Sequence, residues 1–136
     1  MSKGPQQGQT ILVIDDSEVM LERIKKALVA DGHTVTTTTH TVGSARYLPS
    51  CALVIIDYHM PGIDGATVLR SLKSAAQGME HPPLFYLYTS DASVGKHYAR
   101  LGFDGLLGSK GDRAALVREV NAVFRMLRMR EMKKKV

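Results

Sequence analysis

Short runs of branched apolar residues recur along the chain and are separated by segments with a helical repeat. The uninterrupted runs at 11–14 and Leu53–Ile56 are typical of parallel strands that are buried on both faces. Leu84–Tyr88 and a shorter run at Gly105–Leu107 predict two further strands. The segment 33–39 is β-branched but rich in threonine, which predicts an exposed or edge strand.

Helical patterns fill the intervals between these strands. The first expected helix has its N-cap at Ser17 and ends at Gly32, and a short second helix covers 41–48 before Pro49. A third helix follows a turn at 60–65, and a fourth covers 92–101. The closing helix begins near Asp112. The closing helix has the clearest apolar stripe, at Leu116, Val117, Val120, Val123, Phe124 and Leu127.

Five strands that alternate with five helices predict an α/β fold, a doubly wound five-stranded parallel sheet with helices on both faces. The flavodoxin-like strand order 2-1-3-4-5 is expected, and the ends of strands one and three then form the ligand crevice. A chain of 136 residues has room for one core. We expect one domain over 10–128, between a flexible N-terminal segment at 1–9 and a basic tail at 129–136.

The net charge of +5 is concentrated at the end of the chain. Residues 123–136 carry six basic side chains and one acidic one, whereas the two signs balance in residues 1–122. This basic end can complement the carboxyl end of a last helix or contact an acidic partner. No apolar stretch in the polar start suggests a signal peptide or a membrane span, and the single Cys51 suits a reducing, cytoplasmic compartment.

Three aspartates stand at the ends of two predicted strands. Asp15 and Asp16 follow the run at 11–14, and Asp57 follows Leu53–Ile56. Because neighbouring parallel strands end at the same edge of a sheet, we expect the three carboxylates to converge. Like charges repel at such a point unless they share a cation, so the pattern predicts a site for a hard divalent ion, with Mg²⁺ as the best candidate.

A hydroxyl and an ammonium group are predicted at the same edge of the sheet. Thr89 follows the strand Leu84–Tyr88, and Lys110 lies just beyond Gly105–Leu107. A carboxylate can attack phosphorus, while Mg²⁺ and a lysine neutralise the transferring oxygens and a hydroxyl donates a hydrogen bond. The combination therefore indicates phosphoryl chemistry.

With these residues the chain resembles the receiver domains of bacterial two-component response regulators. The matching stretches are ILVIDDSEVM, VIIDYHMPGIDG, LYTSDAS and the lysine of LLGSKGD, and the resemblance covers nearly the whole chain. It implies phosphorylation of Asp57, assisted by Thr89 and Lys110. It also implies a Mg²⁺ site formed by Asp15, Asp16, Asp57 and the backbone carbonyl of His59.

The resemblance further implies partners and an output. A sensor histidine kinase or a phosphotransfer protein would supply the phosphoryl group, and a downstream protein would bind the face of the fourth helix, fifth strand and fifth helix. With no effector or DNA-binding domain of its own, the chain is most similar to the single-domain, chemotaxis-type regulators, which are signalling phosphoacceptors and not enzymes. A phosphorylation-dependent homodimer is another output that the resemblance allows.

The chain departs from the family pattern around Lys110. Gly111 replaces the usual proline, Leu106 and Leu107 stand where a switch aromatic is common, and the spacing from Gly102 to Lys110 is one residue longer. Glycine reaches unusual backbone angles but does not lock them. These differences keep a second hypothesis open, a pseudo-receiver that docks partners without phosphorylation.

Further alternatives concern the hydroxyl, the rim of the site and the reaction. Ser90, directly after Thr89, is a second candidate for the operative hydroxyl. His59 and Asp91 lie two residues past Asp57 and Thr89, and either set the autodephosphorylation rate or are solvated rim residues. An aspartyl-phosphate phosphohydrolase would carry its nucleophile in a DxD pair on the first strand, where this chain has two adjacent acids.

Overall fold

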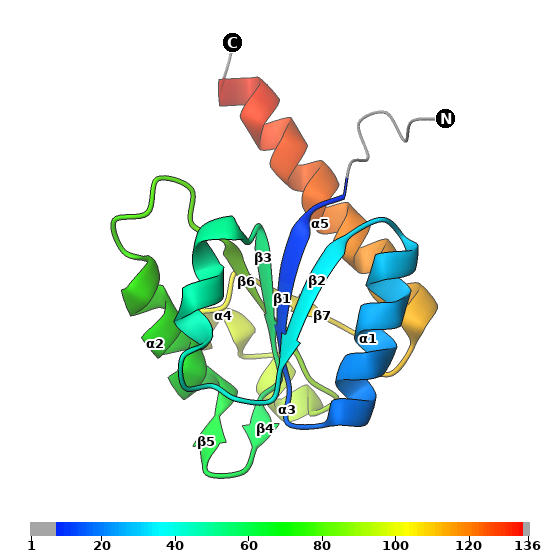
Figure 1. Cartoon of the computed structure of the whole chain (residues 1–136), viewed down its shortest axis with the longest axis vertical. Coiled ribbons are helices and arrows are strands. Elements are labelled where there is room, and N and C mark those ends of the chain that lie inside the picture. Colours follow the sequence, from blue (N-terminus) through cyan, green and yellow to red (C-terminus); the bar gives the residue numbers. More distant parts are fainter. Residues whose placement is uncertain (1–7, 135–136) are drawn as a thin grey trace.

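The computed structural model describes residues 8–134 and contains a five-stranded parallel sheet (Figure 1). The strands are β1 (Thr10–Ile14), β2 (Thr34–Thr38), β3 (Leu53–Ile56), β6 (Leu84–Tyr88) and β7 (Gly105–Leu107). Their order is β2-β1-β3-β6-β7. With β6 and β7 as the fourth and fifth strands of the sheet, this confirms the predicted order 2-1-3-4-5, and β2 lies at an edge as its threonines predict.

Helices enclose the sheet on both faces, as predicted. On one face lie α1 (Glu18–Ala30) and α5 (Arg113–Lys134). On the other face α2 (Gly65–Ala76) packs beside the short helices α3 (Ala92–Gly95) and α4 (Tyr98–Leu101) (Figure 1). The fold is therefore a doubly wound α/β sandwich.

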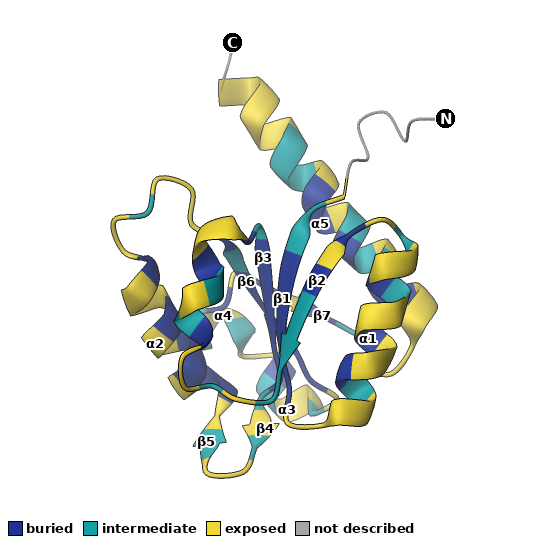
Figure 2. Cartoon of the chain, in the orientation of Figure 1, coloured by how far each residue is buried: buried dark blue, intermediate teal, exposed yellow. Residues whose placement is uncertain are grey.

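The central strands are buried on both faces, because their side chains alternate between two apolar clusters. Ile11 and Val13 pack with α1 and α5, whereas Leu12 and Ile14 pack with α2. Figure 2 shows the central strands β1, β3 and β6 as mostly buried and the outward surfaces of the helices as exposed. The predicted stripe of α5 contributes four buried residues, Leu116, Val120, Val123 and Phe124.

Capping side chains decide where several helices begin. The Ser17 hydroxyl accepts a hydrogen bond from the Met20 N–H at 3.1 Å, which confirms the predicted N-cap of α1. Asp64 caps α2 and Asp91 caps α3 in the same way. These caps hold the loops between the carboxyl ends of the strands and the helices that follow, so they shape the edge of the sheet that carries the polar residues.

The predicted helix over 92–101 is wrong, because the segment forms two short helices, α3 and α4. Gly95 is a weak helix former, and the His97 N–H donates to the Val94 carbonyl, only three residues back, at 3.0 Å. A Cβ atom on Gly95 would lie 3.4 Å from the Leu106 side chain. The segment therefore passes close to β7 at the point where the helix breaks.

The segment before β3 also differs from the prediction. In place of an α-helix over 41–48 ended by Pro49, the chain forms a 3-10 helix, Ser44–Ser50, that contains this proline. A short 3-10 helix has few backbone hydrogen bonds, so Pro49, which has no N–H to donate, is tolerated in it.

A small hairpin follows β3 where the sequence predicted only a turn. Its two antiparallel strands are β4 (His59–Met60) and β5 (Ile63–Asp64). Strands of two residues have no apolar alternation long enough to be recognised in a sequence.

The closing helix extends beyond the predicted end of the domain. It continues to Lys134, across the domain boundary that the sequence predicts at residue 128, and Met129 and Met132 on it are exposed. Residues 1–7 of the predicted flexible segment and residues 135–136 of the predicted basic tail lie outside the described residues. Within residues 8–134, no helix combines the length and the apolar character that a membrane crossing requires.

Candidate functional site

Three carboxylates meet at the carboxyl ends of β1 and β3, as the sequence predicted. Each of Asp15, Asp16 and Asp57 has an oxygen within 4.8 Å of an oxygen of the other two. Asp15 and Asp57 are buried, with 3% and 7% of their surface exposed, whereas Asp16 is exposed. The register of the two strands causes this convergence, because Ile14 pairs with Ile56 and both strands stop there.

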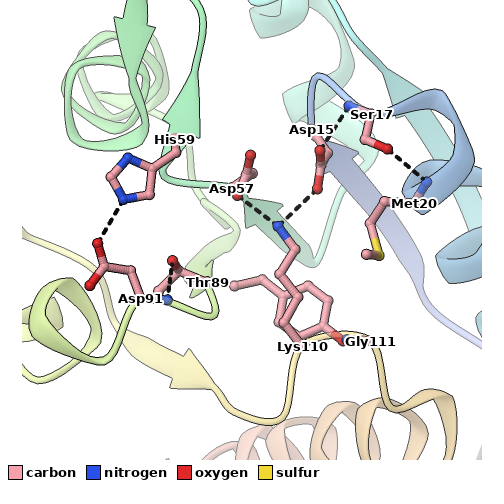
Figure 3. A network of polar contacts seen from close by, with 10 residues as sticks. Asp15, Ser17, Met20, Asp57, His59, Thr89, Asp91, Lys110 and Gly111 are labelled. Carbon is pink, nitrogen blue, oxygen red and sulfur yellow. Dashed lines mark hydrogen bonds and ion pairs between the residues drawn. The ribbon is translucent and has the colours of Figure 1, made fainter.

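The ammonium group of Lys110 lies between two of these carboxylates (Figure 3). Its Nζ atom donates to Asp57 Oδ1 at 2.7 Å and lies 3.1 Å from Asp15 Oδ2. Only 12% of the lysine side chain is exposed. A lysine from the loop after β7 therefore reaches the ends of β1 and β3, which the sequence predicted from its position alone.

Charge and burial act against each other at Asp57. Burial raises the pKa of Asp57 and the negative charges of Asp15 and Asp16 add to this, while the hydrogen bond and the charge of Lys110 oppose it. For Lys110 itself, burial lowers the pKa, but the hydrogen bond to Asp57 and the charge of Asp15 outweigh it, so the pKa is raised. One ammonium group thus does not balance three carboxylates.

This donor set fits a hard divalent cation. The three side chains offer only carboxylate oxygens, the ligands that Mg²⁺ takes in proteins, and the exposed Asp16 leaves one side open to water. A cation held there would offset the repulsion from Asp15 and Asp16, which adds to the larger effect of burial in raising the pKa of Asp57.

Thr89 lies at the carboxyl end of β6 and is buried, with 8% of its surface exposed. Its hydroxyl oxygen accepts a hydrogen bond from the Asp91 N–H at 3.1 Å (Figure 3). This bond uses a lone pair of the hydroxyl and leaves its proton available for donation. The neighbouring Ser90 is exposed.

The side chains of His59 and Asp91 contact each other across the rim of the site. His59 Nε2 lies 2.8 Å from Asp91 Oδ2, and the two side chains are 63% and 33% exposed (Figure 3). The hydrogen bond from Ser93, followed by the one from His59, lowers the pKa of Asp91 to about 2. The sequence singled out both residues but did not predict their contact, because the two loops meet only in the folded chain.

The loop that carries Lys110 has an uncommon backbone. Ser109 has a φ of 53° and Gly111 a φ of 98°, both in the left-handed region. Among residues 8–134 no peptide bond is cis. A residue with a left-handed backbone thus stands on each side of the lysine.

Tyr88 is a residue of this site that the sequence did not single out. Its hydroxyl accepts a hydrogen bond from the Gly111 N–H at 3.2 Å, and Lys110 Nζ lies 5.6 Å from the centre of its ring. Within the apolar strand Leu84–Tyr88 the tyrosine looks like a core residue. Its position directly before Thr89 was the only signal for a role at the site.

Gly65 keeps the loop after Asp57 close to the strand. A Cβ atom at Gly65 would lie 2.4 Å from the Asp57 carbonyl oxygen, and the Gly65 N–H donates to the Tyr58 carbonyl at 2.7 Å. The backbone approach at this point leaves no space for any other residue.

Comparison with known families accounts for this arrangement. The family model described as response regulator receiver domain matches residues 11–121. The chain belongs to the response regulator receiver domains. The matched range contains all five side chains that the sequence singled out at the sheet edge and ends within α5.

Curated relatives of this receiver domain are longer proteins. The probable transcriptional regulatory protein TcrX of Mycobacterium tuberculosis is 30% identical over 96 residues, which cover 68% of this chain and 39% of TcrX. The response regulator PleD of Caulobacter vibrioides is 39% identical over 67 residues, which cover 46% of this chain and 14% of PleD. The receiver domain described here therefore corresponds to less than half the length of these relatives.

Solved structures have the same fold. The chemotaxis protein CheY4 of Vibrio cholerae superposes with a TM-score of 0.72 at 17% identity, covering 85% of this chain and 98% of that one. The response regulator TrrA of Thermotoga maritima, solved in complex with Mg²⁺-BeF, gives a TM-score of 0.69 at 22% identity and covers 84% and 97% of the two chains. At these identities the likeness is one of fold.

Proposed function

We propose that this receiver domain is a phosphoacceptor that takes a phosphoryl group onto Asp57. The donor is the phosphohistidine of a sensor histidine kinase or of a phosphotransfer protein, or a small phosphodonor. The observation that carries this proposal is the contact of Lys110 with Asp57, at 2.7 Å, inside a cluster of three carboxylates. One phosphoryl group can therefore contact the nucleophilic oxygen of Asp57, the buried ammonium group of Lys110 and a metal ion held by the carboxylates.

The transfer follows from the positions of the side chains. An oxygen of Asp57 attacks phosphorus, the bond from phosphorus to the donor nitrogen breaks, and the leaving imidazole keeps the electron pair and takes up a proton. Lys110 neutralises charge on the transferring oxygens, and the Thr89 hydroxyl donates a hydrogen bond to one of them. Bound Mg²⁺ would supply further charge neutralisation, with Asp15, Asp16, Asp57 and the backbone carbonyl of His59 as its protein ligands.

In this proposal the receiver domain acts as a signalling switch and not as an enzyme that turns over a diffusible substrate. Hydrolysis of the adduct breaks the bond between phosphorus and the Asp57 oxygen, which restores the carboxylate and releases phosphate. The TrrA complex with Mg²⁺-BeF supports this proposal, because it pairs the ion and the phosphoryl mimic in a protein of the same fold. A histidine kinase as the donor would place the protein in the cytoplasm.

Mass spectrometry of the intact protein tests the function. After incubation with acetyl phosphate and Mg²⁺, we expect one phosphoryl group per chain, and none when EDTA replaces the ion. Continuous release of phosphate without a stoichiometric adduct would instead indicate a phosphohydrolase. No adduct with either treatment would contradict the proposal and favour the pseudo-receiver.

One observation favours that pseudo-receiver as a second candidate. Of the two leucines on β7 where the family commonly has a switch aromatic, Leu107 is buried, whereas Leu106 is 38% exposed and its side chain lies against Gly95. Leucine has neither the hydroxyl nor the ring of the switch aromatic, so it cannot replace that side chain in responding to a change at Thr89. A downstream protein is proposed to bind the face of the predicted fourth helix (92–101, here α3 and α4), β7 and α5, to which Tyr98 adds an aromatic ring that is half-buried. A phosphorylation-dependent homodimer would use the same face.

The contact of His59 with Asp91 is proposed to slow hydrolysis of the adduct. It closes one side of the rim beside Asp57 and Thr89, so His59→Ala should admit water and shorten the half-life of the phosphoryl adduct several-fold. Loss of the adduct over time is measured by mass spectrometry after the phosphodonor is removed. His81→Ala is the matched control, because His81 lies near Glu80 in another exposed pair. Equal half-lives for wild type and His59→Ala would refute this role.

A further inference from the structure

The position of the Lys110 ammonium group depends on the backbone of the loop 109–112, and the residues of this loop do not by themselves make it rigid. Ser109 and Gly111 both have left-handed φ values, 53° and 98°. A hydrogen bond from the Asp112 N–H to the Ser109 carbonyl, at 2.9 Å, closes a turn around the lysine. Nothing lies within 4 Å of a Cβ atom built on Gly111, so open space lies on the side where a side chain would stand. A flexible glycine beside the lysine needs another constraint.

Tyr88 is the group that meets this loop from the core. Only 2% of its surface is exposed, and it packs in the same apolar cluster as Leu116 and Val120 of α5. From this rigid position its hydroxyl accepts the Gly111 N–H at 3.2 Å. Its ring centre lies 5.6 Å from Lys110 Nζ, within the range of a cation–π contact. One side chain therefore contacts both the lysine and the residue after it.

The chemistry of this contact is specific to the residues of this chain. A proline after Lys110 would have no N–H to donate, whereas Gly111 has one, and the tyrosine hydroxyl accepts it. The pKa of Tyr88 is raised, because the effect of burial exceeds the opposing effects of the Gly111 hydrogen bond and the charge of Lys110. The hydroxyl is therefore neutral at physiological pH.

We propose that Tyr88 is the positioning residue for Lys110, fixing the loop through the Gly111 N–H and supporting the ammonium group with its ring. The inference rests on the proposed function, because Lys110 is the group that neutralises the phosphoryl oxygens. Tyr88 acts through the lysine and does not contact the transferring group.

This role has two consequences with opposite signs. In the metal-free protein Lys110 pairs with Asp57 and Asp15, so it competes with any cation for these carboxylates. In the phosphorylated protein the same lysine neutralises the phosphoryl group. A lysine that is less well held competes less with Mg²⁺ and stabilises the phosphoryl group less.

The variant Tyr88→Phe removes the hydroxyl and keeps the ring. We expect the affinity for beryllofluoride, measured by calorimetry in saturating Mg²⁺, to fall by about 3- to 10-fold, the range for one ordinary hydrogen bond. The initial rate of phosphorylation by acetyl phosphate should fall similarly. The affinity for Mg²⁺ alone should rise. A general loosening of the fold would weaken both affinities together, so the opposite signs distinguish positioning from a structural role.

Tyr86→Phe is the matched control. Tyr86 lies two residues earlier on β6, in the same cluster, and is 8% exposed, but its ring lies against Gly105 and not against the Lys110 loop. This variant should keep both affinities close to the wild-type values. A second control combines Tyr88→Phe with Lys110→Ala, where the tyrosine change should have no further effect on either affinity.

Three results would overturn the inference. These are a Mg²⁺ affinity that is unchanged or weaker in Tyr88→Phe, an equal effect of Tyr86→Phe, and an undiminished effect of Tyr88→Phe in the Lys110→Ala background. Failure of the proposed function is distinguishable, because wild type would then form no adduct with acetyl phosphate. In that case a tighter Mg²⁺ site in Tyr88→Phe would still support the positioning of Lys110.

Discussion

Asp57→Asn is expected to abolish the phosphoryl adduct. Asparagine has nearly the same shape as aspartate, but its amide has no carboxylate oxygen to attack phosphorus. The variant should remain folded, because burial and the charges of Asp15 and Asp16 raise the pKa of Asp57 and so disfavour its ionised form in the native protein. Mass spectra after incubation with acetyl phosphate and Mg²⁺ would show only the unmodified chain.

Asp64→Asn is the matched control for this change. Asp64 lies on β5, outside the carboxylate cluster, and caps α2 by accepting the Thr67 N–H at 2.8 Å, a role that asparagine also performs. This variant should form the adduct like wild type. A full adduct on Asp57→Asn would show that another residue is the acceptor.

Lys110→Ala is expected to slow formation of the adduct by about 100- to 1,000-fold, the usual effect of removing one group that neutralises transition-state charge. Phosphorylation would be followed by mass spectrometry over time with acetyl phosphate in saturating Mg²⁺. Lys26→Ala is the control, because Lys26 forms only an exposed contact with Glu22 on α1.

The same substitution has a second expected effect, on stability. Without the ammonium group, Asp15 and Asp57 lose their cation and repel each other, so the melting temperature in EDTA should fall by several degrees. Mg²⁺ should restore more of the stability in Lys110→Ala than in wild type. Equal rates and equal melting temperatures in the two proteins would show that the lysine is only a neighbour of the site.

The acidic part of the site was predictable because its causes are local. Asp15, Asp16 and Asp57 follow directly after short runs rich in valine and isoleucine, which are typical of buried parallel strands. Parallel pairing then brings the ends of β1 and β3 together, with Ile14 opposite Ile56. The position of Thr89 after β6 follows from the same reasoning.

The segment 92–101 shows where such reasoning fails. Its composition is compatible with one helix, but the close approach of Gly95 to Leu106 and the three-residue hydrogen bond of His97 divide it into α3 and α4. The break depends on β7, a strand that follows later in the chain. Helix propensity describes each residue in its local segment and therefore does not predict a contact with a later strand.

The sequence by itself determined the strand order, the edge of the sheet at which the acids meet and the receiver-like set of polar residues, because apolar runs, caps and the handedness of the crossovers act over short distances. The tertiary structure alone decided which oxygens Lys110 contacts and that the Tyr88 hydroxyl accepts a hydrogen bond from the Gly111 N–H. These contacts join residues 53 and 23 positions apart, for Lys110 with Asp57 and for Gly111 with Tyr88. They exist only once the core has placed β6, β7 and α5 against one another.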